Sequence, residues 1–308
     1  MTHFFDWHIH LTGSIPVNYW REILYLKGCL NGRSSQDLGN QLYMQNSTAW
    51  SDLKICTETP GGFRDTVEFV ISDMISRGVS GANFIFNPYS LIKRGLDLSR
   101  TFEMLDPFLS SLLEERKFYP LFRIGVNRRD GIDELERVAK IFKENKPKYL
   151  WLEAIDINGD EEKYPLKPFI SELLNLRKES LPYTIHAGEG LNNISSLEEA
   201  ISCSPLRIGH GVSSVREESL VQEIKDKKIA LELCVSSNLK TLGIPFEKYP
   251  LLELFETGMD ILLGSDNPSF INSTIEREYS LIESIVGGQG LDKVESNTEK
   301  YLRRNNFF

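Results

Sequence analysis

The chain has 308 residues, 41% of them hydrophobic and 26% charged, a composition that excludes intrinsic disorder, a collagen-like repeat and a coiled coil. Its length fits either one large α/β barrel or two smaller domains. Lys and Arg total 35 against 44 Asp and Glu, so the net charge of -9 argues against binding to nucleic acid or to an anionic membrane surface. A small-molecule partner is therefore expected.

Short apolar runs alternate along the chain with longer amphipathic stretches, a pattern typical of βα units and a parallel sheet. The predicted strands are Phe4–Leu11, Ala82–Phe86, Leu121–Val126, Leu150–Asp156, Tyr183–Ala187, Leu206–Gly211, Ile229–Cys234 and Asp260–Gly264. Helical periodicity is present at Phe63–Arg77, Arg100–Lys117, Ile132–Glu144, Leu166–Lys178, Val215–Lys227 and Tyr249–Thr257, and again from near Thr274. Eight βα repeats favour a (β/α)8 TIM barrel over an open doubly wound sheet.

Nothing in the sequence divides the chain into domains, because it has no linker rich in Pro, Gly or Ser and no low-complexity tract. We therefore predict a single barrel domain over residues 1–308. The polar stretch 31–62 is the least regular part and is interpreted as an insertion after the first strand and helix. It either covers the barrel mouth, where active-site lids lie, or is an ordinary surface excursion.

The cysteines and the first residues bear on the compartment. The four cysteines are far apart and form no C-x-x-C pair, so neither a zinc ribbon nor a dithiol redox motif is expected. The first residues lack the basic and apolar regions of a signal peptide. No stretch approaches the ~18 apolar residues that a membrane helix needs. These observations predict a cytoplasmic protein.

His8 and His10 are two residues apart at the end of the first predicted strand, so strand alternation points both side chains to the same face. Inside a barrel, that face is the interior. Two imidazoles there form half of a site for Zn²⁺ or a similar ion, although a pair of hydrogen-bonded interior histidines fits the motif equally well. By the same alternation, Asp6 is expected to face the same way as His8. It is then either a hydrogen-bonding partner of the metal-binding residues or simply a surface acid near the N-terminus.

Four further candidates lie at the ends of later strands. His186 ends the fifth strand, Glu189 follows it by three residues, His210 ends the sixth strand, and Asp266 follows the eighth. Each has a purely structural alternative: Glu189 as a solvated acid, His210 as a core histidine and Asp266 as a helix N-cap. Together, however, four of the five histidines fall at predicted strand ends, where the catalytic groups of such barrels gather.

The motifs that contain these residues resemble those of the adenosine deaminase family within the amidohydrolase barrels. The matching segments are His8-Ile-His10-Leu-Thr-Gly13, His186-Ala-Gly-Glu189, Arg207-Ile-Gly-His-Gly211, Ser236-Ser-Asn238 and Ser265-Asp-Asn-Pro268. A weaker similarity is Ile155-Asp-Ile-Asn-Gly-Asp-Glu161. The resemblance spans residues 8 to about 270, and it implies a metal-dependent amidohydrolase barrel.

The resemblance also implies how the metal and the nucleophile are held. His8, His10, His186 and Asp266 would bind one zinc ion per chain and leave a position for water. Zinc lowers the pKa of that water toward about 7. His210 and Asp266 would orient the water and accept its proton as it attacks C6 of a 6-aminopurine.

The remaining implied roles concern the substrate. Glu189, in its protonated form, would donate to ring N1, and the Gly159 amide would bind N3. His10, Thr12 and Asn267 would complete the substrate-binding residues. Two of these positions depart from the family. At position 12, adenosine-specific members usually carry an Asp that accepts a hydrogen bond from the ribose, and adenine-specific relatives carry a Glu; at position 267, most members carry an Asp that contacts N7. Thr12 removes a negative charge, which lowers the repulsion of an anionic substrate, whereas the Asn267 amide can still donate at any pH.

The sequence thus favours zinc-dependent hydrolytic deamination of a 6-aminopurine nucleoside or related compound to its 6-oxo product and ammonia. An alternative is an amidohydrolase of the same fold that acts on an N6-substituted purine nucleotide or another small cyclic substrate. A binuclear variant is disfavoured, because the predicted strand around Glu153 has no lysine to bridge two metals. A nucleoside-binding protein without catalysis is a third possibility. The expected binding partner is a small-molecule purine substrate. The sequence does not predict an oligomeric state.

Overall fold

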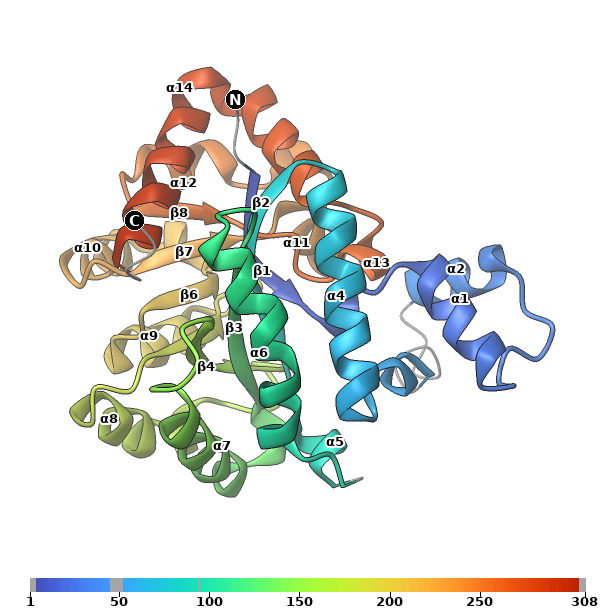
Figure 1. The fold of residues 1–308 in the computed structure, drawn as a ribbon. Helices are drawn as coiled ribbons and strands as arrows, with labels where there is room; N and C mark the ends of the chain where they lie inside the picture. Colours follow the sequence, from blue (N-terminus) through green and yellow to red (C-terminus); the bar gives the residue numbers. More distant parts are fainter. Residues whose placement is uncertain (1–3, 45–51, 94, 305–308) are drawn as a thin grey trace.

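The eight predicted strands are all present, and they form one parallel sheet in the order β1 to β8 (Figure 1). The structure is a computed structural model that describes residues 4–44, 52–93 and 95–304. The strands are β1 Phe4–His10, β2 Val79–Phe86, β3 Tyr119–Asn127, β4 Leu152–Asn158, β5 Tyr183–Ala187, β6 Arg207–His210, β7 Ala230–Leu233 and β8 Asp260–Leu263. Because sequential strands pair in parallel, helical crossovers connect them, and the predicted (β/α)8 barrel is confirmed.

The barrel closes through the residues that follow β8. The amide of His10 donates to the carbonyl of Asp266 at 2.7 Å, and the amide of Asp266 donates to the carbonyl of His8 at 2.7 Å. Asp266 therefore lies directly opposite Ile9 of β1, between His8 and His10.

An irregularity in β1 corrects one expectation. The register with β2 shifts between Asp6 and Ile9, so β1 contains one extra residue there. Such a bulge interrupts strand alternation, and the prediction that Asp6 faces the site together with His8 was wrong. Asp6 is buried and accepts hydrogen bonds from the amide and hydroxyl of Ser265 instead.

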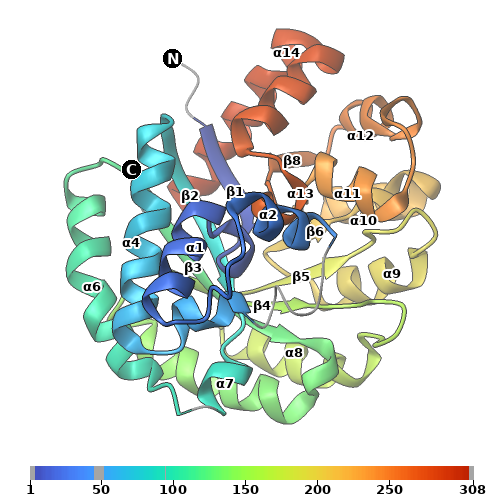
Figure 2. The ribbon, with the colours of Figure 1, turned by 90° about the vertical axis from the view of Figure 1, so that its right-hand side faces the viewer.

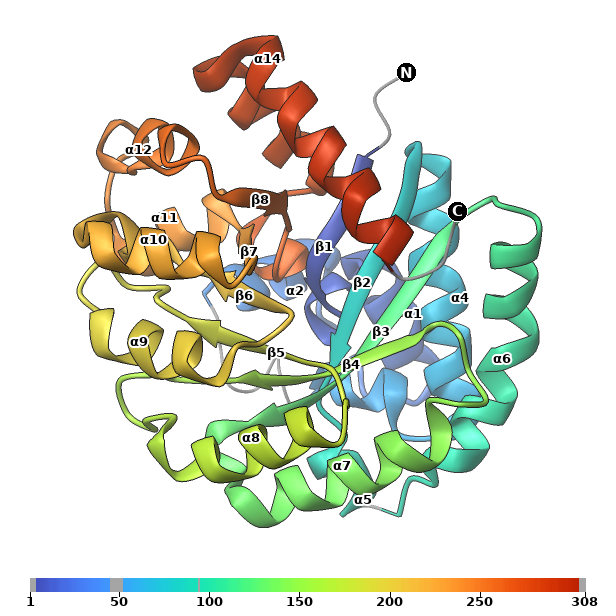
Figure 3. The same ribbon diagram turned by 90° about the vertical axis from the view of Figure 1, so that its left-hand side faces the viewer.

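Helices surround the strands (Figure 3). Those that cover the barrel are α4 Pro60–Ser76, α6 Leu98–Glu114, α7 Ile132–Asn145, α8 Ile170–Lys178, α9 Ile194–Cys203, α10 Glu218–Asp226, α12 Leu251–Glu256 and α14 Ile275–Arg304. Shorter helices at the strand ends are α5 Tyr89–Ile92, α11 Val235–Leu242 and α13 Pro268–Ile271. No helix in the described part of the chain is both long and apolar enough to cross a membrane.

Sequence periodicity located the long helices but not all of the short ones. Strand β4 begins and ends two residues later than predicted, so Asn158 belongs to it. The predicted helix from Val215 starts at Glu218, because residues 212–216 form a separate 3-10 turn. Helices α9 and α11 were not predicted from their sequences, because local periodicity is a weak signal over so few residues.

The region after β1 builds a second, smaller hydrophobic core. It contains α1 Val17–Leu26 and α2 Ser35–Tyr43, the latter opened by a capping box between Ser34 and Asp37. Trp20, Leu24, Leu38 and Leu42 pack in this core together with Phe270 of α13. Figures 1 and 2 show α1 and α2 projecting from the side of the barrel where α13 lies.

These contacts bear on the stretch 31–62, which was predicted to be irregular. It holds α2, a short 3-10 turn at Lys54–Thr57 and the start of α4, while residues 45–51 lie outside the described residues. Since Phe270 follows Asp266 by four residues, this small core is anchored next to the metal-ligand candidates. Its function as a lid stays a prediction.

Candidate active site

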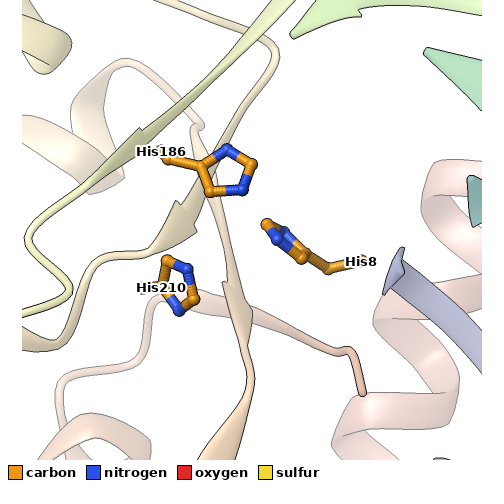
Figure 4. A group of neighbouring side chains, drawn as sticks. All are labelled: His8, His186 and His210. Carbon is orange, nitrogen blue, oxygen red and sulfur yellow. The ribbon is translucent and has the colours of Figure 1, made fainter. Parts of the chain in front are cut away.

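The residues predicted from the motifs converge at the carboxyl ends of the strands. His8 and His10 lie at the end of β1, His186 on β5 and His210 on β6. Figure 4 shows the rings of His8, His186 and His210 turned toward one another, and their centroids are 4.4 to 5.5 Å apart. His3 lies outside the described residues, so all four histidines that the structure describes belong to this cluster.

Four potential ligand atoms lie at separations that suit one metal ion. The Nε2 atoms of His10 and His186 are 3.2 Å apart, and Oδ1 of Asp266 is 3.4 Å from Nε2 of His10 and 3.9 Å from Nε2 of His8. Tetrahedral ligands at about 2.05 Å from zinc are separated by about 3.3 Å. Two overlapping groups could hold an ion, one of His8, His10 and Asp266 and the other of His8, His186 and His210.

Glu232 determines which nitrogen of His8 is available to a metal. Its carboxylate lies 2.7 Å from Nδ1 of His8, and both side chains are fully buried. Although burial alone would raise the pKa of Glu232, the neighbouring guanidinium groups of Arg123 and Arg207 hold it well below its usual range. An ionised carboxylate can only accept, so Nδ1 carries the proton and Nε2 keeps its lone pair. That Nε2 is buried without a hydrogen-bond partner, as expected of a ligand atom.

Asp156 orients His186 in a similar way. Its Oδ1 lies 3.1 Å from Nδ1 of His186 and accepts a hydrogen bond from Asn158, while its Oδ2 accepts one from Thr184. Burial disfavours charge on both partners, yet their attraction raises the pKa of His186 and holds that of Asp156 well below its usual range. Partners of this kind fix the ring orientation of metal-binding histidines.

Three of the four ligand candidates, His8, His10 and Asp266, have the protonation state that a metal site requires. Burial lowers the pKa of His8 to about 3 and that of His10 to about 4, so both imidazoles are neutral near pH 7. Burial alone would raise the pKa of Asp266, but the surrounding histidines hold it below its usual range. Neutral imidazoles and an ionised carboxylate are the forms that bind zinc.

A buried network of charges lies beneath the histidines. Arg123 donates to Glu232, Thr184 and the carbonyl of Trp7, and Arg207 donates to both Glu232 and Glu153. Counted over six of the buried groups, two guanidinium groups and four carboxylates leave two negative charges. These groups are Arg123, Arg207, Glu153, Asp156, Glu232 and Asp266. A divalent cation would neutralise the two negative charges, so the charge balance also fits a zinc ion.

The two proton-transfer candidates face each other across the site. Nε2 of His210 lies 4.0 Å from a carboxylate oxygen of Glu189, whose side chain is about one-third exposed at 32%. Nδ1 of His210 lies 3.0 Å from the side-chain nitrogen of Asn238, and Tyr249 donates to the Asn238 oxygen. His210 also has a left-handed backbone with φ of 68°, a conformation that costs about 1–3 kcal/mol and often occurs at functional sites.

Asp266 shares this left-handed conformation, with φ of 60°, and is held from two sides. The hydroxyl of Ser237 donates to its Oδ2 at 2.5 Å, and the amide of Asn267 donates to its Oδ1 at 2.6 Å. Asn267 in turn packs closely on Gly13, where a Cβ atom would lie 2.1 Å from the Asn267 oxygen. Only glycine fits there, which explains the small residue that follows Thr12.

The two remaining substrate-binding candidates also lie at the ends of strands. Thr12 begins the 3-10 turn after β1 and is partly exposed. Gly159 follows β4 with φ of 104°, and a Cβ atom on it would lie 2.7 Å from the side-chain oxygen of Asn127. The Gly159 backbone therefore requires glycine for both its conformation and its surroundings.

Several residues of the site were not predicted from the motifs. Glu232 and Asp156 were missed as partners of the histidines, and Arg123 and Arg207 as partners of these carboxylates, although each is a charged residue inside an apolar predicted strand. A charge in a buried strand must be paired, and that rule could have identified them. Glu161, which binds the loop of Glu189, left no such signal because it lies in a polar loop.

Comparison with known proteins agrees with this geometry. The family model described as adenosine deaminase matches residues 40–298. An adenosine deaminase of Haemophilus ducreyi is 26% identical over 295 residues, which cover 90% of this chain and 84% of that protein. An aminodeoxyfutalosine deaminase of Streptomyces coelicolor is 24% identical over 235 residues, which cover 74% of this chain and 59% of that protein.

A solved structure agrees in fold along the whole chain. The apo structure of the N6-methyl-AMP deaminase from Arabidopsis thaliana superposes with a TM-score of 0.81 at 19% identity, and the alignment covers 100% of this chain and 92% of that one. The family model alone covers most of the chain. It includes the candidate metal ligands His186 and Asp266, but not His8 and His10 on β1. The chain therefore belongs to the adenosine deaminase family of hydrolytic deaminases.

Proposed function

We propose that the protein is a zinc-dependent aminohydrolase that converts a 6-aminopurine nucleoside or a related compound to its 6-oxo product and ammonia. The observation that carries the proposal is the convergence of Nε2 of His10, Nε2 of His186 and Oδ1 of Asp266 around the unpartnered Nε2 of His8. Family membership supports deamination as the reaction, and the polar groups at the rim are suited to a small heterocycle as the substrate.

His8, His10, His186 and Asp266 would hold the metal. Three imidazole nitrogens and one carboxylate match the ligands that zinc prefers, and a fifth position could take water because catalytic zinc can expand its coordination to five. When bound, zinc supplies Lewis-acid activation of a water molecule at neutral pH.

The chain's own residues would move the protons. His210 lies beside the proposed metal ligands, of which Asp266 is one. These two side chains would hold the attacking water and accept its proton. Glu189 would donate a proton to N1 of the purine as the new C6–O bond forms, so that negative charge does not build up on the ring. The C6–N bond then breaks, ammonia leaves with the proton that the base received, and the proton of the new 6-hydroxyl group returns to Glu189 as the 6-oxo product forms.

Three positions at the rim would orient the purine. The amide of Gly159 would bind N3, and the side-chain NH2 of Asn267, which has a second hydrogen besides the one donated to Asp266, would bind N7. Thr12 would lie on the side of the N9 substituent. Because Gly159 and Glu189 come from the loops after β4 and β5, the ring would be fixed along one edge by two neighbouring loops.

Thr12 supports a second candidate, an N6-substituted purine nucleotide. A neutral hydroxyl does not repel a phosphate as a carboxylate would, and N6-methyl-AMP is the substrate named for the Arabidopsis protein of the same fold. In that case the amine released would be methylamine instead of ammonia.

A substrate panel tests both candidates. Purified zinc-loaded protein is incubated with adenine, adenosine, 2′-deoxyadenosine, AMP, N6-methyl-AMP and aminodeoxyfutalosine. Loss of the 6-amino group is followed by ultraviolet absorbance, and the released amine is identified. We expect turnover of at least one compound, and no turnover of any aminopurine would refute the proposal.

The Glu189→Gln variant tests the proton donor. We expect loss of turnover with about one zinc retained per chain, because Glu189 is assigned to the purine and not to the metal. The matched control is Glu198→Gln on the exposed face of α9, which should keep full activity. Full activity of Glu189→Gln would show that another group protonates N1.

A further inference from the structure

The carboxylate of Glu161 is bonded to the loop that carries Glu189. Its Oε2 accepts from the amide of Gly188 at 2.8 Å, and its Oε1 accepts from the amide of Glu189 at 2.9 Å. The same Oε1 also accepts from the side chain of Asn193 at 2.5 Å and lies 3.5 Å from the amide of Gly190. One side chain thus receives hydrogen bonds from three consecutive backbone amides.

These bonds join two separate loops. Glu161 lies in the loop after β4, two residues beyond Gly159, whereas residues 188–190 form the loop after β5. Neither Gly159 nor Gly188 has an ordinary backbone, since their φ angles are 104° and 68°. Glycine adopts such conformations without a steric penalty, so both loops can turn sharply at these positions.

Arg128 supports the same region from below. Its guanidinium donates to the carbonyl of His186 at 2.6 Å and to the carbonyl of Tyr164 at 3.3 Å, and the side chain is almost completely buried. The start of the β5 loop and the end of the β4 loop are therefore both bonded to one rigid group. The carboxylate of Glu161 then fixes the tip of the β5 loop, where Glu189 lies.

We propose that Glu161 is a positioning residue that sets the distance between the Glu189 carboxyl group and the Gly159 amide. This inference rests on the proposed function, in which Glu189 serves N1 and Gly159 serves N3 of one purine ring. Those two ring atoms have a fixed separation, so the two loops must keep a fixed separation as well. Hydrogen bonds from amides to an ionised carboxylate are short and strong, which suits this purpose.

The proposal predicts which kinetic constant changes. The interaction between Glu189 and N1 becomes strong only in the transition state, when the proton is transferred. The metal and the residues at the rim would bind the substrate in its ground state with or without Glu161. A misplacement of about 1 Å in a catalytic group costs about 100-fold in rate. Loss of Glu161 should therefore lower kcat by about 10- to 100-fold and change KM by less than about threefold.

Two variants grade the effect. Glu161→Ala removes every acceptor, whereas Glu161→Gln keeps one oxygen and places an amide donor against a backbone donor. We expect kcat to fall from wild type through Glu161→Gln to Glu161→Ala, with zinc content unchanged. Glu162→Gln is the matched control, because Glu162 is the adjacent exposed acid, and its kcat should equal that of the wild type.

Hydrogen exchange gives a readout that does not depend on activity. The amides of Gly188, Glu189 and Gly190 should exchange faster in Glu161→Ala, while amides in β5 keep their protection. A purely structural role would instead lower the thermal midpoint and leave kcat of the folded enzyme unchanged.

The outcomes separate the two proposals. If the wild type deaminates a purine and Glu161→Ala does so with the same kcat, the positioning role is refuted and the proposed function stands. If the wild type deaminates no purine, the proposed function fails, and unchanged exchange at residues 188–190 would then refute the role of Glu161 separately.

Discussion

Replacing Glu232 with glutamine tests whether the buried charge network prepares His8 for a metal. Glu232 accepts from Nδ1 of His8 at 2.7 Å and from Nε of Arg207 at 2.6 Å, and it lies 3.0 Å from Nη1 of Arg123. A glutamine has only one oxygen to offer these three donors. Since two of them are guanidinium groups, the oxygen would turn toward the arginines and the NH2 group toward His8.

The amide would then donate to Nδ1 of His8, which shifts the proton of the neutral imidazole to Nε2. A protonated Nε2 cannot bind a metal, so part of the zinc affinity is lost. Changes in such partner residues typically weaken metal binding by about 10- to 100-fold, or about 1.4 to 2.8 kcal/mol. Because the two arginines also lose an anionic partner, the unfolding free energy should fall by about 3–5 kcal/mol.

Zinc affinity is measured by competition with a chelator, and stability by denaturant unfolding of the metal-free protein. Glu153→Gln is the matched control, because Glu153 binds Arg207 and Asn83 in the same buried network. Both variants should lose stability, but only Glu232→Gln should lose zinc affinity. An affinity of Glu232→Gln within twofold of the wild type would refute the assignment of the His8 tautomer.

Three further variants follow from the geometry around the site. Burial raises the pKa of Asp6 to about 7, so its contribution to stability is fully present below about pH 4 and is lost as the pH rises through 7, by up to about 4 kcal/mol. Asp6→Asn should therefore flatten the unfolding free energy of the metal-free protein between pH 5 and 8, and an unchanged slope would contradict this. Asn267→Asp introduces a carboxyl that must be protonated to donate to Asp266, so deaminase activity should fall about tenfold per pH unit above the pKa of the new group; a pH profile equal to that of the wild type would exclude this contact. Gly159→Ala should lower stability by about 1–3 kcal/mol through backbone strain and contact with Asn127, measured by thermal unfolding, and a midpoint equal to that of the wild type would contradict the strain.

Local patterns were sufficient to predict the barrel and the residues at its mouth. Alternation of apolar runs with amphipathic stretches predicted all eight strands, since each buried strand is a separate apolar segment in the sequence. The histidines could be located because their motifs lie at strand ends, and the ends of parallel strands meet on one side of a barrel. The sequence alone therefore predicts that His8, His10, His186 and His210 lie in one cluster.

The partners of these histidines depended on the tertiary structure. Glu232 is 224 residues from His8 in the sequence and Asp156 is 30 residues from His186, and no local pattern relates such positions. The bulge in β1 likewise depends on pairing with β2, so alternation gave the wrong orientation for Asp6.

The sequence by itself thus determined the fold class, the family and the atoms available for chemistry, because these follow from residue type and short-range periodicity. Only the tertiary structure decided the protonation state of His8 and His10, the tautomer of His8 and the hydrogen bonds from the loop of Glu189 to Glu161. Those properties arise from burial and from contacts between distant strands and loops, and they exist only once the barrel has closed.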